Sequence, residues 1–156
     1  MIDTEANVPL AEKLAVLLSN IRVFVALTQG YHWNVKGADF KELHAFFSDI
    51  YDDVDDSIDP LAENILKLGY DAPYLLEDFI DMSVIGNVQR ITNGDGMAMV
   101  QSLYESNKIV IGLITVAFDE ASSATTSQSI ANFLADRLDM HQKWNWQLAA
   151  TLGMRN

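Results

Sequence analysis

Residues 10–27 read LAEKLAVLLSNIRVFVAL, and this stretch is the clearest indication of a helical fold. Its apolar side chains recur every three or four positions, which is the period of one face of an α-helix. We therefore predict a helix from about residue 8 to residue 35, slightly weakened at Gly30 because glycine is a poor helix former. The residues of this stripe are Leu10, Leu14, Leu17, Leu18, Ile21, Val25 and Leu27.

Three further long helices are expected, at residues 39–68, 97–121 and 127–152. Asp39 and Glu42 form a capping box at the start of the first of these, and Gly69 ends it. Residues 72–82 contain Pro73 and are interpreted as a linker with one short helix. Core candidates in the third long helix are Met99, Leu103, Ile109, Ile111, Leu113 and Val116.

Four helices with one long connection between the second and the third indicate a fold class. No strand-like alternation, internal repeat or low-complexity tract competes with it. The expected fold is all-α, a ferritin-like four-helix bundle with a short helix in the long connection, formed by residues 1–156 as a single domain.

The composition restricts the function. The net charge is -12, from 22 acidic and 10 basic residues, and such a surface repels nucleic acid, whose binding depends on neutralised phosphates. Cysteine is absent, which excludes disulfides and thiolate ligands and fits a cytoplasmic protein. No apolar run approaches the roughly 18 residues of a membrane span, and no signal peptide is recognised.

Four residues have the chemistry of metal ligands: His32, His44, Asp59 and Glu63. Imidazole and carboxylate together suit iron, zinc or manganese. A helical hairpin about Gly37 places the two histidines at similar height. If residues 39–67 form one helix, however, His44 and Asp59 lie roughly 22 Å apart, so one metal ion cannot contact both within a chain.

Two interpretations of these residues remain open. In one, a second copy related by a two-fold axis brings Asp59 and Glu63 to the histidines of the first. In the other, the histidines form hydrogen bonds inside the bundle and the carboxylates are solvated. For the acidic run at residues 52–56, the default interpretation is likewise a solvated helix face.

A longer pattern carries a family resemblance. Residues 31–40 (YHWNVKGADF) are followed by Leu43-His44, by Phe47, by Tyr51 and by residues 59–63 (DPLAE). This pattern resembles the signature of the Dps family, ferritin-like mini-cages of the DNA-protection-during-starvation type. The likeness extends to His141, Gln142, Lys143 and Trp146 in the last helix and covers essentially the whole chain.

The resemblance implies a hollow shell of twelve subunits that oxidises ferrous iron, preferably with hydrogen peroxide or else with O2. The oxidation sites would lie at two-fold interfaces, and the stored ferric mineral would protect against oxidative stress. By position, His32 with the neighbour's Asp59 and Glu63 would hold the first iron. His44 would help to hold the second, with Glu63 as a bridge. Trp33 would accept a stray oxidising equivalent or simply pack at the interface.

Several positions depart from the family pattern. Ser48 stands where an acidic ligand is usual, which weakens the second iron site unless Asp52 substitutes through a water molecule. Asn64 replaces an arginine beside the site. Near the entry pore, Ser127 and Asn132 replace common aspartates. Nearby acidic residues that would compensate are Asp119, Glu120 and Asp136.

These departures leave alternatives. The first is a ferroxidase and iron-storage cage, and the second is a structural or protective metal-binding cage with an impaired second iron site. A third is a cage that binds zinc or another divalent ion as a stability element. The N-terminal residues 1–7 are acidic and the C-terminus offers only Arg155, so no DNA binding is expected in any of them.

Overall fold

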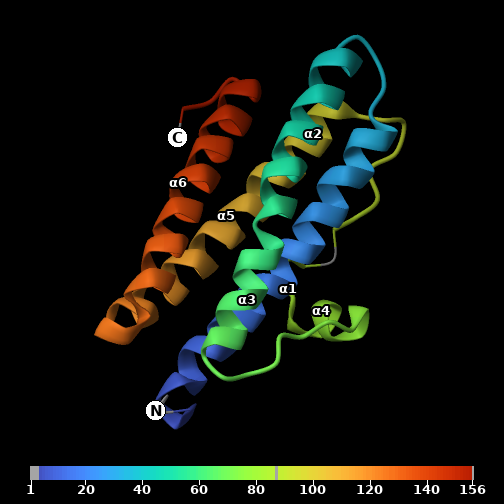
Figure 1. Ribbon diagram of the computed structural model, residues 1–156. Helices are drawn as coiled ribbons and strands as arrows, with labels where there is room; N and C mark the ends of the chain where they lie inside the picture. The colour runs from blue at the N-terminus through green and yellow to red at the C-terminus, as the bar shows by residue number, and fades with distance from the viewer. Residues whose placement is uncertain (1–3, 87, 156) are drawn as a thin grey trace.

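The structure is a computed structural model that describes residues 4–86 and 88–155. Figure 1 shows the long helices side by side, with the short helix beside them in the long connection. The elements are α1 (Thr4–Asn34), α2 (Phe40–Asp56), α3 (Ile58–Lys67), α4 (Leu76–Met82), α5 (Gly96–Ser122), the 3-10 helix η1 (Thr125–Ser127) and α6 (Gln128–Thr151). The prediction of an all-α four-helix bundle with a short helix in the connection is confirmed.

Within the described ranges, none of the helices combines the length and the hydropathy of a membrane-spanning segment. Residues 1–3 of the acidic N-terminal segment lie outside the described residues.

The second helix begins where the sequence predicted, but the interaction that starts it is a different one. Asp39 is the N-cap residue, yet its side chain makes no capping hydrogen bond, so the expected capping box is wrong. Gly37 has φ +109°, a left-handed conformation that favours glycine. Its carbonyl accepts a hydrogen bond from the Phe40 amide at 3.1 Å. The reversal therefore depends on Gly37.

The second long helix of the prediction consists of two helices, not of one. α2 ends and α3 begins on either side of Ser57, although the two continue in roughly the same direction (Figure 1). Pro60 lacks the amide hydrogen that would bond the carbonyl four residues earlier, at Asp56. Ser57 tightens the junction instead, because its amide and its Oγ both donate to the Val54 carbonyl, at 3.1 and 2.6 Å.

The core is the apolar interior of the bundle. Leu14, Phe24 and Phe47 are fully buried in it. In α5 the predicted stripe is only partly right, since Val116 is 50% exposed. The inward face of that helix includes Met99, Leu103, Val110, Ile114 and Ala117.

A polar network crosses this interior and joins α2 to α5 and α6. Asp53 accepts two hydrogen bonds from Arg137, at 3.0 and 2.9 Å, and one from Trp144 Nε1 at 2.8 Å. Arg137 Nη2 also lies 3.2 Å from His141 Nε2, and His141 Nδ1 lies 2.7 Å from Asn107 Oδ1. Asn107 Nδ2 donates to the His141 carbonyl, which leaves its Oδ1 as the acceptor. His141 is therefore neutral, with its proton on Nδ1.

The electrostatics of the network agree with this assignment. Burial and the nearby Arg137 charge lower the pKa of His141 to about 3, against a smaller opposing effect of Asp53. Burial by itself would raise the pKa of Asp53. The hydrogen bonds from Arg137 and Trp144 outweigh that effect and hold the pKa below its usual value. Asp53 is thus a paired interior carboxylate, and its prediction as part of a solvated acidic run is wrong.

A second interior contact anchors the long connection. Asn20 is fully buried, and its Oδ1 accepts hydrogen bonds from Ser83 Oγ, the Val84 amide and the Ile85 amide at 3.1, 2.9 and 3.0 Å. The segment after α4 is therefore held against α1.

The neutral His141 predicts a pH dependence of stability. In the unfolded chain a histidine has a pKa of about 6.5, whereas the folded value is about 3. As the pH falls below about 6.5, the unfolded state binds a proton that the folded state does not. Stability should then decrease by up to about 1.4 kcal/mol per pH unit.

Urea unfolding at pH 7, 6, 5 and 4 measures this slope, and His141→Gln is the control that removes the titrating ring. The variant should lose stability less steeply on acidification than the wild type. Equal slopes for the two proteins would contradict the assignment of a buried neutral histidine.

Candidate metal centre

The end of α1 and the start of α2 bring His32 and His44 into direct contact. The ring centroids lie 3.7 Å apart, and the ring planes differ by 13°. The Gly37 reversal places the two residues at the same height, as the hairpin argument predicted. Both side chains are partly exposed.

Two reciprocal hydrogen bonds orient the rings. His32 Nδ1 lies 2.6 Å from the His44 carbonyl, and His44 Nδ1 lies 2.7 Å from the His32 carbonyl. A carbonyl oxygen only accepts, so each Nδ1 carries the proton and donates it. In the neutral ring the lone pair is then on Nε2, the arrangement that metal-binding histidines have when their other nitrogen donates to a carbonyl.

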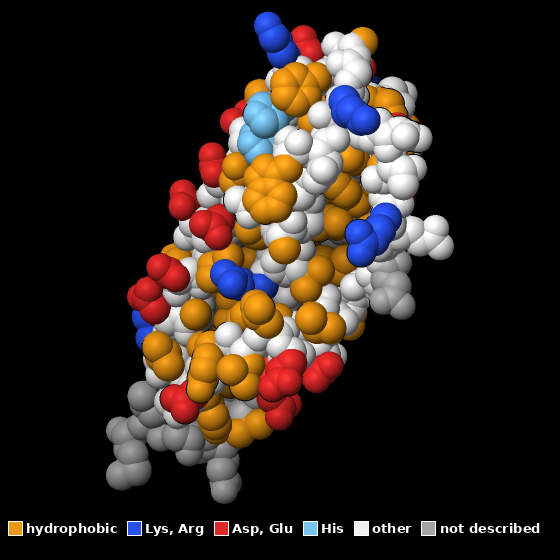
Figure 2. Space-filling view, turned by 90° about the vertical axis from the view of Figure 1, so that its right-hand side faces the viewer, with side chains coloured by type: hydrophobic (Ala, Val, Ile, Leu, Met, Phe, Trp, Pro, Cys, Tyr) orange, Lys and Arg blue, Asp and Glu red, His pale blue; other side chains and the backbone are white. Residues whose placement is uncertain are grey.

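The surroundings of the pair are aromatic on one side and acidic on the other. Phe40 stacks on His44 with centroids 4.8 Å apart, and the Tyr51 ring meets His32 edge-on at 5.4 Å. Trp33 is 67% exposed. Figure 2 shows the histidines at the surface between hydrophobic side chains, with acidic side chains along the neighbouring edge of the same face.

The carboxylates predicted as ligands lie elsewhere. Asp59 is in the first turn of α3 and Glu63 is one turn further on, and both are exposed. Among the described residues, no three His, Asp or Glu side chains are grouped so that they could hold a metal ion. The structure thus brings the two histidines together and leaves the two carboxylates on one helix, without joining the pairs.

Two other predicted positions near the site have defined contacts. The Ser48 hydroxyl donates to the Ala45 carbonyl at 2.9 Å, on its own helix, and Asp52 is exposed. Asn64, where the family pattern has an arginine, is buried and accepts a hydrogen bond from Lys67 Nζ at 3.2 Å.

The positions considered for an entry pore differ in their exposure and contacts. Ser127 is buried, and Glu120 forms an ion pair with Lys13 at 3.2 Å. Asp119, Asn132 and Asp136 are exposed. Their place in a pore stays a prediction.

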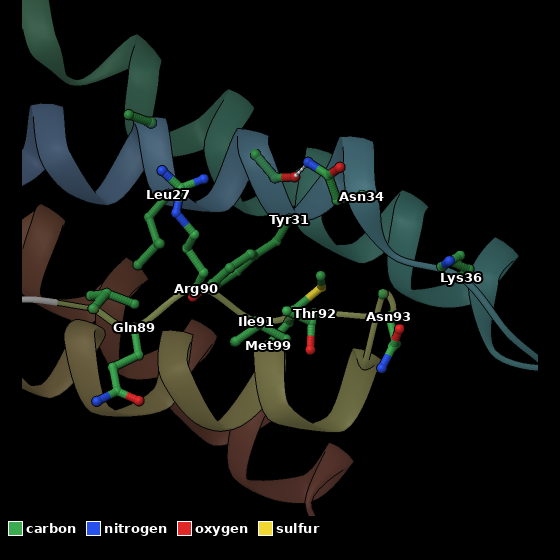
Figure 3. A pocket seen from close by; sticks show the side chains of 14 residues that line it. Leu27, Tyr31, Asn34, Lys36, Gln89, Arg90, Ile91, Thr92, Asn93 and Met99 are labelled. Carbon is green, nitrogen blue, oxygen red and sulfur yellow. Dashed lines mark hydrogen bonds between the residues drawn. The ribbon is translucent and has the colours of Figure 1, made fainter.

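A pocket of about 560 Å³ lies between the end of α1 and residues 88–94. None of the described residues that line it is a His, Asp or Glu. In Figure 3 the Arg90 side chain runs towards α1 beside Leu27, whereas Lys36 lies beyond the end of that helix. The two cations do not point to one place, so this pocket offers neither metal ligands nor a convergent anion site.

The partners of Asp53 were not predicted from the sequence. The available signal was the pair Arg137 and His141, one helical turn apart on a helix that also carries Trp144. Such side chains on an inward face need a buried acceptor.

Comparison with known proteins supports the same fold. The family model described as a ferritin-like domain matches residues 11–155. The crystal structure of a DPS protein from Vibrio cholerae O1 has a TM-score of 0.90 and 32% identity, and the match covers 97% of this chain and 93% of that chain.

Two relatives are similar in sequence. The DNA protection during starvation protein of Brevibacillus brevis is 30% identical, with 89% of this chain and 94% of the relative covered. General stress protein 20U of Bacillus subtilis is 29% identical, with 87% and 92% covered. The resemblance read from the histidine and carboxylate motifs is thereby confirmed: the chain belongs to the ferritin-like family and, within it, to the Dps family.

Proposed function

We propose that this protein is a ferroxidase and iron-storage cage that protects against oxidative stress. The observation that supports the proposal most strongly is the pair His32 and His44, whose Nε2 lone pairs are left available by the reciprocal Nδ1 hydrogen bonds. The related Vibrio cholerae protein is described as a member of a superfamily of ferritin-like diiron-carboxylate proteins. The histidines and carboxylates of this chain are the matching donor types.

The proposed site is shared between two chains. A second copy related by a two-fold axis would bring Asp59 and Glu63 of the partner subunit to His32 and His44. The long connection supplies a surface for such a contact, because Tyr74, Leu76 and Ile80 are 80%, 70% and 70% exposed. Large exposed apolar side chains grouped in this way mark an interaction surface. Hydrophobic side chains gather on the face that also bears the histidines (Figure 2).

In this arrangement His32 with the partner's Asp59 and Glu63 would bind the first ferrous ion. His44 would bind the second, with Glu63 as a bridge and Asp52 acting through water. Iron is the substrate, and the carboxylates favour the ferric product. Two ferrous ions, one hydrogen peroxide and two protons give two ferric ions and two waters. The paired electrons avoid the one-electron reaction that releases hydroxyl radical.

A second candidate function follows from Ser48. Its hydroxyl is a weak ligand, and its proton is donated to the Ala45 carbonyl. The second iron position, at His44, then lacks the acidic ligand that the family pattern usually has at position 48. The alternative is a structural or protective cage that holds one metal tightly and oxidises slowly.

An anaerobic ferrous titration separates the two functions. We expect two ferrous ions per site, followed by fast formation of ferric absorbance on addition of peroxide and a slower reaction with O2. One tightly held ion with slow oxidation would instead favour the alternative and make Ser48→Asp the next variant.

The matched variants for this titration are His32→Ala and Glu42→Gln. His32→Ala should weaken binding of the first ferrous ion by at least about 100-fold, since a direct ligand is lost where outer-shell changes already cost 10–100-fold. Glu42→Gln removes an exposed charge from the first turn of α2 and should bind as the wild type does. Unfolding of His32→Ala at 25 °C would mean that this histidine is structural.

We further propose a dodecameric, cytoplasmic cage that does not bind DNA. The charge of -12 per chain opposes contact with phosphates. In a gel shift at low salt near pH 7, without divalent cations, the DNA should migrate unretarded. A version with an added Lys-rich tail serves as the positive control. Retarded DNA with the unmodified protein would contradict the expectation.

A further inference from the structure

The junction at Ser57 lies between the two halves of the proposed site. Towards the N-terminus, α2 carries His44, and beyond the junction α3 carries Asp59 and Glu63. α3 packs mainly on α1, and its Leu61 and Ile65 are buried. Since a helical hydrogen bond is missing at the junction, the direction of α3 depends on what holds the two sides of Ser57.

The Asp53–Arg137 contact holds the α2 side. Asp53 lies four residues before Ser57, and its carboxylate receives two parallel bonds from Arg137 and a third from Trp144. The side chains of Asp53 and Arg137 are only 23% and 14% exposed. A bidentate pair restricts orientation as well as distance.

Arg137 also reaches the other side of the junction. A cavity of about 10 Å³ is lined by Arg137 and His141 of α6 together with Ser57 and Leu61. Arg137 Nε is buried and makes no hydrogen bond among the described residues. The Arg137 side chain therefore contacts the last turn of α2 and lines a small cavity together with Leu61 in the first turn of α3.

We propose that Asp53 and Arg137 form a positioning pair that sets the direction of α3, and thereby places Asp59 and Glu63 for the histidines of the partner subunit. This inference rests on the proposed function. Neither residue contacts iron, and both act through the Ser57 junction.

A metal site tolerates little displacement of its ligands, so the direction of α3 matters for binding. Glu63 lies six residues beyond Ser57, about 9 Å along the helix, so a tilt of about 10° moves it by about 1.5 Å. Ligand distances in metal sites are held to within about 0.2 Å. A small change in the direction of α3 would therefore weaken binding without disturbing the bundle.

The test compares Asp53→Asn with Asp56→Asn, using Co2+ alone as the probe. The two variants lose the same charge, but Asp56 is exposed and is closer in sequence to Asp59. We expect Asp53→Asn to weaken Co2+ binding by about 10–100-fold, the range of outer-shell changes. Its visible Co2+ spectrum should also shift, because the ligand geometry changes. Asp56→Asn should stay within about twofold of the wild type with an unchanged spectrum.

A third variant, Trp144→Phe, removes one donor and keeps the ion pair, so it should shift the spectrum in the same direction by less. This variant also replaces Asp53→Asn in the test if Asp53→Asn fails to fold. Size-exclusion chromatography with circular dichroism establishes folding and assembly. Wild-type affinity and spectrum in folded Asp53→Asn would overturn the inference. Equal weakening in Asp53→Asn and Asp56→Asn would overturn it too, as a simple charge effect.

Other outcomes would contradict the proposed function itself, and they are distinct from those that overturn the positioning pair. If the wild type binds no Co2+, or if His32→Ala binds it as the wild type does, the metal site itself is wrong and the positioning role falls with it.

Discussion

The reciprocal hydrogen bonds between His32 and His44 are the contact on which the proposed chemistry depends. Each imidazole donates from Nδ1 to the other residue's carbonyl, at 2.6 and 2.7 Å, and these hydrogen bonds do not involve Nε2. The stacked rings stiffen each other, which lowers the cost of ordering them when a metal binds. Gly37 makes the contact possible, because the reversal there sets α1 and α2 in register.

The second constraint is distance. The carboxylates of α3 do not join these histidines among the described residues of one chain, so the proposed metal site needs a second chain. The bundle also contains the means to keep the carboxylate helix in place. The network of Asp53, Arg137, His141 and Asn107 links three helices beside the Ser57 junction. Asn20 holds the long connection against α1. The proposed shared site thus depends on rigid elements on both sides.

Much of the fold was predictable because helical periodicity is local. The long helices and the pairing of the histidines followed from apolar spacing and one glycine. The break at Ser57 was not predicted, although Pro60 is a signal for it. Proline is tolerated in the first turn of a helix, so Pro60 marks the start of a new helix after the break. Asp53 was hidden in an acidic run, and its partner Arg137 is 84 positions away in sequence. A contact between residues so far apart in the sequence depends on helix packing, which no local pattern predicts.

Complementation between two inactive variants tests most directly whether the site is shared. One variant lacks both histidines (His32→Ala with His44→Ala), and the other lacks both carboxylates (Asp59→Asn with Glu63→Gln). In a mixed two-fold pair, one site has all four ligands and the other has none. Random co-assembly should therefore restore about a quarter of the wild-type ferrous binding and oxidation, while each variant alone stays inactive. Mixed assemblies that form but remain inactive would contradict a site shared between two chains.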